Sequence, residues 1–203
     1  MNFETIPLFS HPINIFNLNF NTQQSEKIQE IINSTEYRLN DSGNAFISKN
    51  LKVLEDPKLN FLKDEFSKAL NEFNEKIMGY EKNNLKITTS WFTKCEPGQQ
   101  SHRHNHKNSL YSGVYYNNVD DYSKILFYNN DWRGNNYQLK INDYNFYNSD
   151  TWSIEPKSGS LIIFPSYLSH KIIKNNSTKT RYSLAFNCIP RPPYGDADSS
   201  VRS

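Results

Sequence analysis

The feature that most constrains the fold is a change of pattern near residue 85. From there the chain consists of short segments rich in β-branched and aromatic side chains, separated by turn residues such as Pro97-Gly98 and Asn175-Asn176. The segments that read as strands are LKITTSWFTKC, SGVYYNN, KILFYNN, TWSIEP, GSLIIFPS, HKIIKNN and TRYSLAFNCI. No helical pattern lies between them. This spacing predicts a mainly β fold, a sandwich or a barrel-like jelly roll.

Helical periodicity is confined to the first half of the chain. Residues 21–34 place three isoleucines on one face, behind Asn21 or Thr22 as the cap. Residues 56–80 give the stronger signal, with a cap at Asp56, a proline in the first turn and Gly79 at the end. The apolar residues that repeat at helical spacing there are Leu59, Leu62, Phe66, Leu70, Phe73 and Ile77. We expect the helices to buttress one face of the β structure.

A chain of 203 residues is long enough to bury a core as one domain. We expect a single domain over residues 1–190, with helical support over about 1–84 and a β core over about 85–190. The remaining segment, 191–203, is rich in proline and small polar residues and predicts a loose or partner-ordered tail.

Charge and composition argue against several classes of protein. The formal net charge is +2 without a basic stripe, so nucleic-acid binding has little electrostatic support. No apolar run approaches the ~20 residues that a membrane helix needs. Two cysteines make no disulfide framework, and the N-terminus lacks a signal-peptide pattern. We therefore expect a cytoplasmic protein; its oligomeric state stays open.

The chain has five histidines, and three of them, His102, His104 and His106, alternate within SHRHNH. In a strand, residues two apart point to the same face, so either neighbouring pair could reach one metal ion. Neutral imidazole suits Fe, Zn, Cu and Ni, so the ligand type alone does not name the metal. A polar surface loop with incidental histidines is the competing interpretation, which the clustering disfavours.

The second half of the chain supplies a partner for this cluster. His170 lies at the edge of a predicted strand, and Arg181 follows eleven residues later, with Ser183 two positions on and on the same face. A cation and a hydroxyl one strand from a metal ligand suit a dicarboxylic cosubstrate. One of its carboxylates and its keto group would chelate the metal, and the far carboxylate would bind Arg181.

The motifs HRHNH, FPSYLSH and TRYSLAFN resemble those of the iron(II)- and 2-oxoglutarate-dependent oxygenases, over about residues 88–188. CEPGQQSHRH is also similar to the stretch before the first iron ligand of prolyl 4-hydroxylases. NSLYSGVYY and GSLIIFPSYLSH resemble a branch from bacteria and phages whose near pair reads His-x-His. The resemblance implies a double-stranded β-helix with Fe(II), 2-oxoglutarate and O2.

Residue by residue, the resemblance implies His104, His106 and His170 as iron ligands and leaves His102 as a bystander. Arg181 and Ser183 match the family's cosubstrate-binding pattern. Strand alternation turns either Tyr115 or Tyr116 inward, and Ser112 shares a face with Tyr116, so Ser112 and Tyr116 are further cosubstrate candidates.

The sequence departs from the family pattern in two ways. His106 stands where most members have a carboxylate, which raises the charge of the site by one unit. Cys95 stands where prolyl hydroxylases carry a tyrosine, and Arg181 replaces their lysine. The prolyl-hydroxylase activity is therefore not inherited with the fold.

Two rivals remain. A cupin-type three-His metal enzyme fits the spacing from Gly98 to His106, but positions 110–112 lack its glutamate and the interval from Gly159 to His170 is too long. A non-catalytic jelly roll with structural zinc would more often use cysteine ligands.

The sequence thus predicts a dioxygenase that hydroxylates a C–H bond of a peptide side chain or of a small molecule. The insert at 128–152, polar and aromatic, is expected to shape the substrate entrance.

Overall fold

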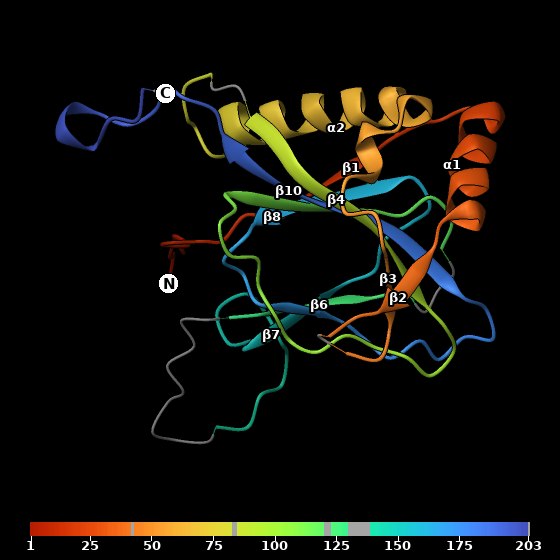
Figure 1. The fold of residues 1–203 in the computed structure, drawn as a ribbon. Helices are drawn as coiled ribbons and strands as arrows, with labels where there is room; N and C mark the ends of the chain where they lie inside the picture. Colours follow the sequence, from red (N-terminus) through yellow and green to blue (C-terminus); the bar gives the residue numbers. More distant parts are fainter. Residues whose placement is uncertain (42, 83–84, 120–122, 130–138, 203) are drawn as a thin grey trace.

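The computed structural model describes residues 1–41, 43–82, 85–119, 123–129 and 139–202. Two antiparallel sheets dominate it (Figure 1). The larger sheet has seven strands in the order β1-β8-β5-β10-β4-β3-β2, and the smaller has three in the order β7-β6-β9. This is the predicted mainly β fold, a double-stranded β-helix or jelly roll of two antiparallel sheets.

Strands formed where the sequence predicted them. Their bounds are β4 Leu85–Cys95, β5 Tyr111–Tyr115, β6 Ile125–Tyr128, β7 Thr151–Ile154, β8 Ser160–Pro165, β9 His170–Ile172 and β10 Arg181–Pro190. Short strands that the sequence did not predict come from the first half of the chain. They are β1 Asn14–Asn17, β2 Tyr37–Leu39 and β3 Phe46–Ser48, and they extend the larger sheet at both edges.

The first predicted helix is confirmed as α1, Thr22–Ser34. Asn21 is its N-cap, and the side chains of Asn21 and Gln24 each accept from the other's backbone N–H, which is a capping box. Ile28 and Ile32 are buried on the inner face. A capped amphipathic segment therefore formed as its local sequence directs.

The second predicted helix is divided into three pieces. A 3₁₀ turn at Pro57–Leu59, capped by Asp56, leads into α2, Asn60–Glu72, which continues as a π-helix at Phe73–Ile77. The wider π turn rotates the side chains that follow it. Ile77, expected on the buried face, is consequently 45% exposed, so that part of the prediction is wrong.

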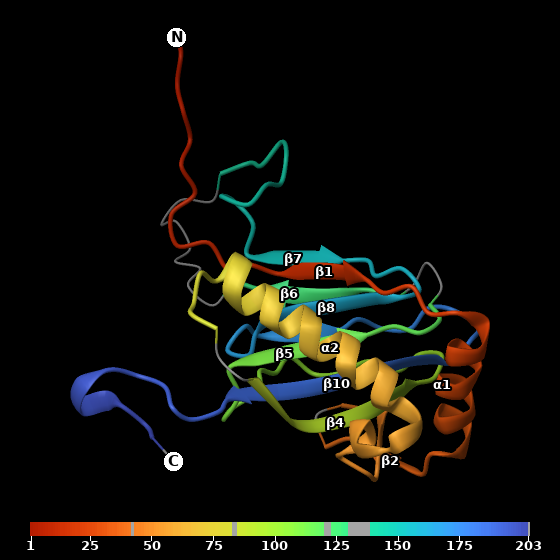
Figure 2. The same cartoon turned by 90° about the horizontal axis from the view of Figure 1, so that it is seen from above.

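Helices α1 and α2 cover one face of the larger sheet, and the smaller sheet covers the other (Figures 1 and 2). Strand alternation divides the buried side chains accordingly. Phe66 of α2 packs with Phe186 and Tyr115 on the helix side, whereas Val114 and Phe164 pack with Phe127 of β6 between the sheets. The sheet is therefore buried on both faces.

The segment after β10 leaves the body of the molecule, as Figures 1 and 2 show. It contains a bridge between Tyr194 and Val201 and a 3₁₀ turn at Ala197–Ser199. The division into a domain at 1–190 and a tail at 191–203 stays a prediction. Among the helices of the described ranges, none combines the length and the apolar character that crossing a bilayer requires.

Candidate metal centre

The loop between β4 and β5 carries His104 and His106 and pairs with β9 through a bridge between His104 and His170. His104 and His170 exchange both backbone hydrogen bonds, N–H to O at 2.9 and 2.8 Å. Such an antiparallel pair holds its Cα atoms ~5.5 Å apart. The N–H of His106 donates to the carbonyl of Ser166, 3.0 Å away. Backbone pairing thus joins histidines that are far apart in the sequence.

The imidazoles of His104, His106 and His170 converge. Each offers one nitrogen, and these atoms all lie within 4.8 Å of one another. The ring centroids are 5.2 Å apart for His104 and His106, 4.5 Å for His104 and His170, and 5.2 Å for His106 and His170. Within the described residues this is the one group of its kind. His102 is exposed and does not join it.

Hydrogen bonds orient two of the three rings. Nδ1 of His104 lies 2.9 Å from the carbonyl oxygen of His102, and Nδ1 of His170 lies 3.0 Å from that of Leu168. A carbonyl oxygen only accepts, so each Nδ1 carries the proton and each Nε2 keeps a lone pair for a metal. His102, predicted as a bystander, therefore contributes its backbone oxygen.

The imidazoles of His106 and His170 are neutral near pH 7. Burial, and then the neighbouring His104, lower the pKa of His106 to about 4 and that of His170 to about 3. Neutral imidazole is the form that binds metals, so few protons compete for the site. The ring of Trp91, 5.7 Å from that of His106, closes one side.

Arg181 and Ser183 both point between the sheets, on the face predicted for them. They lie opposite Cys95 and Thr93 of β4, and both are buried. Nη2 of Arg181 is 3.5 Å from the carbonyl oxygen of Ile173, three residues beyond His170. The guanidinium therefore lies just beyond the end of β9, the strand that begins with His170.

Tyr116, not Tyr115, is the tyrosine that faces between the sheets. Burial raises the pKa of Tyr116 to about 12, and the nearby Arg181 opposes this rise. Arg181 also lines a pocket of about 100 Å³ together with Ser123. The Ser123 hydroxyl is buried without a hydrogen-bond partner in the described part of the chain. An unpaired buried hydroxyl is costly, so a polar ligand atom fits there.

Ser112 shares the Tyr116 face, but its hydroxyl is already engaged. It donates to Oδ1 of Asn187 at 2.8 Å and lies 2.7 Å from the hydroxyl of Ser166. Its cosubstrate role stays a prediction.

One positioning residue escaped the sequence reasoning. The buried Asn175 donates through Nδ2 to the carbonyls of Cys95 and Lys179, at 2.9 and 2.8 Å. It thereby fixes the turn that leads into Arg181. The Asn-Asn dipeptide marked a turn, but no local signal revealed this contact across the sheet.

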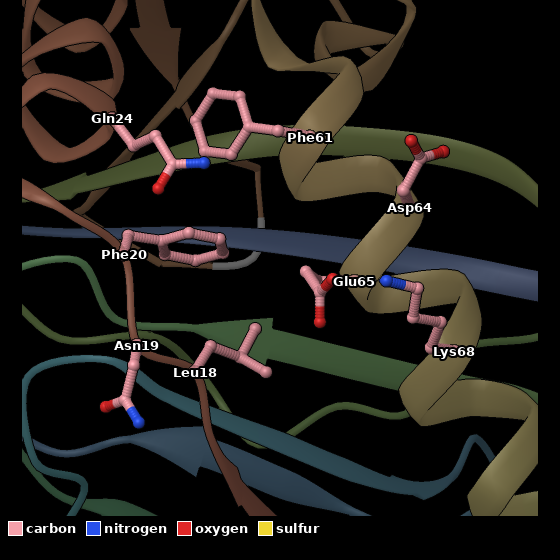
Figure 3. A pocket seen from close by; sticks show the side chains of 8 residues that line it. All are labelled: Leu18, Asn19, Phe20, Gln24, Phe61, Asp64, Glu65 and Lys68. Atoms are coloured by element: carbon pink, nitrogen blue, oxygen red, sulfur yellow. Dashed lines mark hydrogen bonds and ion pairs between the residues drawn. The ribbon is translucent and has the colours of Figure 1, made fainter.

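A separate pocket of about 290 Å³ lies on the helix side of the larger sheet. Figure 3 shows Phe20 from the β1–α1 linker facing Phe61 of α2, beside Glu65 and Lys68. None of the site residues predicted from the sequence lines it. The histidines instead contact Trp91, Phe127 and Phe164, which pack on the opposite face of this sheet.

A family model matches residues 89–187, which include all three clustered histidines and both Arg181 and Ser183; its description is "Putative 2OG-Fe(II) oxygenase". No curated protein sequence matches the chain.

Solved structures share the fold across most of the chain. A Pseudomonas putida prolyl-4-hydroxylase is 15% identical, covers 91% of this chain and 96% of its own, and has a TM-score of 0.60. A prolyl hydroxylase from Trichoplax adhaerens, in complex with a hypoxia inducible factor peptide fragment, is 15% identical, with coverages of 89% and 84% and a TM-score of 0.59. HygX from Streptomyces hygroscopicus, with nickel, 2-oxoglutarate and hygromycin B bound, is 9% identical, with coverages of 89% and 83% and a TM-score of 0.58.

Proposed function

We propose that this chain is an oxidoreductase of the 2OG-Fe(II) oxygenase type, to which the matching family model and the shared fold point. It would hydroxylate a C–H bond of a peptidyl side chain or of a small molecule. The observation that carries the proposal is the convergence of three imidazoles, whose ligand nitrogens lie within 4.8 Å of one another, in a chain that also buries Arg181 between the sheets. Metal ligands and an anion-binding group are the two parts that 2-oxoglutarate needs.

His104, His106 and His170 would hold Fe(II). Three protein ligands would leave the metal free to bind the cosubstrate and O2 as well. Because all three ligands are neutral, the 2-oxoglutarate dianion would neutralise the Fe(II) charge. The geometry supports His106 as the third ligand, since its ring lies as close to His170 as to His104.

Arg181 would bind the distal carboxylate of 2-oxoglutarate, with Ser183 beside it. The guanidinium contacts the carbonyl oxygen of Ile173 and the sulfur of its strand partner Cys95, both at 3.5 Å, so its position is partly set before a ligand binds. Tyr116 lies near enough to influence the same carboxylate. The burial of Arg181 and its contact with the residue that follows β9 support this assignment.

Iron(II) with 2-oxoglutarate, when bound, supplies the chemistry: O2 oxidises 2-oxoglutarate to succinate and CO2 and inserts one oxygen atom into the substrate C–H bond. The chain's own residues orient the metal ligands and enclose the site. Phe127 and Phe164 pack against His170, at ring distances of 5.8 and 4.8 Å, and keep water from that side.

The substrate class follows only by analogy. Among the neighbours, one holds a peptide fragment and another holds hygromycin B. The insert at 128–152 would shape the entrance; its residues 130–138 lie outside the described part, and of the rest Phe146 stacks on Trp152 at 4.8 Å. The cytoplasmic location and the kinship with phage sequences stay predictions.

The test is anaerobic addition of Fe(II) and then 2-oxoglutarate to the metal-free protein. We expect a visible metal-to-ligand charge-transfer band that needs both additions and that succinate does not produce. A protein that binds Fe(II) but gives no band would contradict the proposal.

A cupin-type enzyme is the second candidate, because a three-His ligand set occurs in that superfamily. Such an enzyme needs no arginine for a dicarboxylate. Fe(II) binding with O2 consumption that is indifferent to 2-oxoglutarate would favour it. Metal binding without any O2 consumption would favour a non-catalytic jelly roll.

A further inference from the structure

Ser166 is a buried serine that uses every polar atom it has. It is the first residue after β8 and is 0% exposed. Its N–H donates to the carbonyl of Leu110, and its own carbonyl accepts from the N–H of His106, both at 3.0 Å. Its hydroxyl lies 2.7 Å from that of Ser112 and 2.8 Å from that of Ser109. Ser166 therefore binds the loop that carries His106 at two positions, His106 and Leu110.

The hydroxyls extend this contact into the larger sheet. Ser112 of β5 donates to Asn187 of β10, and Ser109 donates to the carbonyl of Cys188 at 3.1 Å. Neither partner strand contributes a histidine to the metal group. The network thus connects the His106 loop to the two central strands that form the rigid wall of the site.

The same turn orients a second imidazole. The N–H of Leu168 donates to the carbonyl of Pro165 at 3.0 Å, and the carbonyl of Leu168 accepts from Nδ1 of His170. One turn of six residues, 165–170, therefore sets the backbone of His106 and the ring of His170. A shift of this turn would move both groups relative to His104.

We propose that Ser166 is a positioning residue of the three-His centre, acting through the Ser109–Ser112–Asn187 network. The inference rests on the proposed function only in taking the three histidines as metal ligands; it needs neither 2-oxoglutarate nor turnover. Without the Ser166 hydroxyl, the turn loses its side-chain hydrogen bonds to Ser109 and Ser112, and Ser166 keeps only its backbone contacts. The imidazoles then no longer hold one fixed geometry. Outer contacts of this kind typically change metal affinity 10–100-fold.

The experiment is titration of the metal-free protein with Co(II), which reports both affinity and ligand geometry through its visible spectrum. For Ser166→Ala we expect about tenfold weaker Co(II) binding and an altered visible spectrum. The matched control is Ser160→Ala at the other end of β8. Ser160 is equally buried, and its hydroxyl accepts one hydrogen bond from the N–H of Lys157, 3.1 Å away. We expect it to bind Co(II) within about twofold of the original protein.

A second variant covers a folding failure of the first. Ser112→Ala removes the same side-chain connection from the sheet side. Because both substitutions act on one network, the double variant Ser112→Ala with Ser166→Ala should bind Co(II) no more weakly than whichever single variant has the lower Co(II) affinity. Thermal melts of the metal-free variants check that each is folded.

Co(II) affinity and spectrum that change no more in Ser166→Ala and Ser112→Ala than in Ser160→Ala would overturn the inference. A different result would contradict the proposed function. A protein that binds Co(II) through His104, but whose Fe(II) form gives no 2-oxoglutarate-dependent charge-transfer band, would refute the oxygenase activity and leave the role of Ser166 intact.

Discussion

The two faces of the seven-stranded sheet have opposite characters, although the same strands build both. On the helix side, alternate residues of β5 and β10 are Tyr111, Tyr115 and Phe186, which pack under α2. The alternate residues of the same strands that face the other side include Ser112, Ser183 and Arg181, all of them buried. One face is a hydrophobic core, and the other carries buried polar groups near three histidines.

The difference teaches how one sheet serves stability and chemistry together. Buried apolar area stabilises the strands from the helix side, at about 25 cal/mol per Å². That stabilisation lets the opposite face hold a buried arginine and converging imidazoles, which are costly to bury. Changes on the helix side should therefore reduce stability, and changes on the histidine side should reduce ligand binding.

The largest effect is expected on the histidine side. His104→Ala should weaken Fe(II) or Co(II) binding by more than about 100-fold, because loss of an outer contact alone costs 10–100-fold. The melting temperature of the metal-free protein should not fall. A metal titration beside a thermal melt checks both, and unchanged affinity would remove His104 from the centre.

Phe66→Ala tests the helix side. Phe66 is fully buried and stacks on Phe186 at 5.1 Å. Its truncation should lower the free energy of unfolding by about 3–5 kcal/mol, as for other buried aromatics. Urea denaturation measures this change. Co(II) affinity of the folded variant should stay within about twofold, and a large loss of affinity would show that the two faces are coupled.

Arg181→Ala should weaken 2-oxoglutarate binding about 100-fold, because charge-assisted hydrogen bonds to a carboxylate contribute about 3 kcal/mol. Metal affinity should change little. Calorimetric titration of the Mn(II)-loaded protein with 2-oxoglutarate measures the first effect. Arg181→Lys keeps the charge but not the planar guanidinium group. Its affinity for 2-oxoglutarate should lie between that of the original protein and that of Arg181→Ala. Equal losses of metal and cosubstrate binding would show that Arg181 only supports the fold.

The smallest effect is expected for His102→Ala. The exposed ring is removed while the backbone carbonyl that accepts from His104 is kept. Stability should change by less than about 0.5 kcal/mol, and metal affinity should be unchanged. A clear loss of Co(II) binding would place the His102 ring in the centre.

The sequence by itself determined what depends on near neighbours in the chain. Alternation decided which side chains of β5 and β10 face which layer, and capping residues decided where α1 begins. The clustering of histidines in SHRHNH indicated a metal site, and the resemblance to the oxygenases selected His104, His106 and His170. The structure brings these three side chains together, and their role as iron ligands stays a prediction.

Only the tertiary structure decided what depends on strand pairing and packing. β1, β2 and β3 lie in the half of the chain where helical periodicity dominates, and they formed because a sheet edge was there to pair with. The π turn of residues 73–77 exposed Ile77 against its periodicity. The contacts of Ser166 and Asn175 join segments more than 50 residues apart, and no local pattern records such a contact because hydrogen-bond partners are chosen in space.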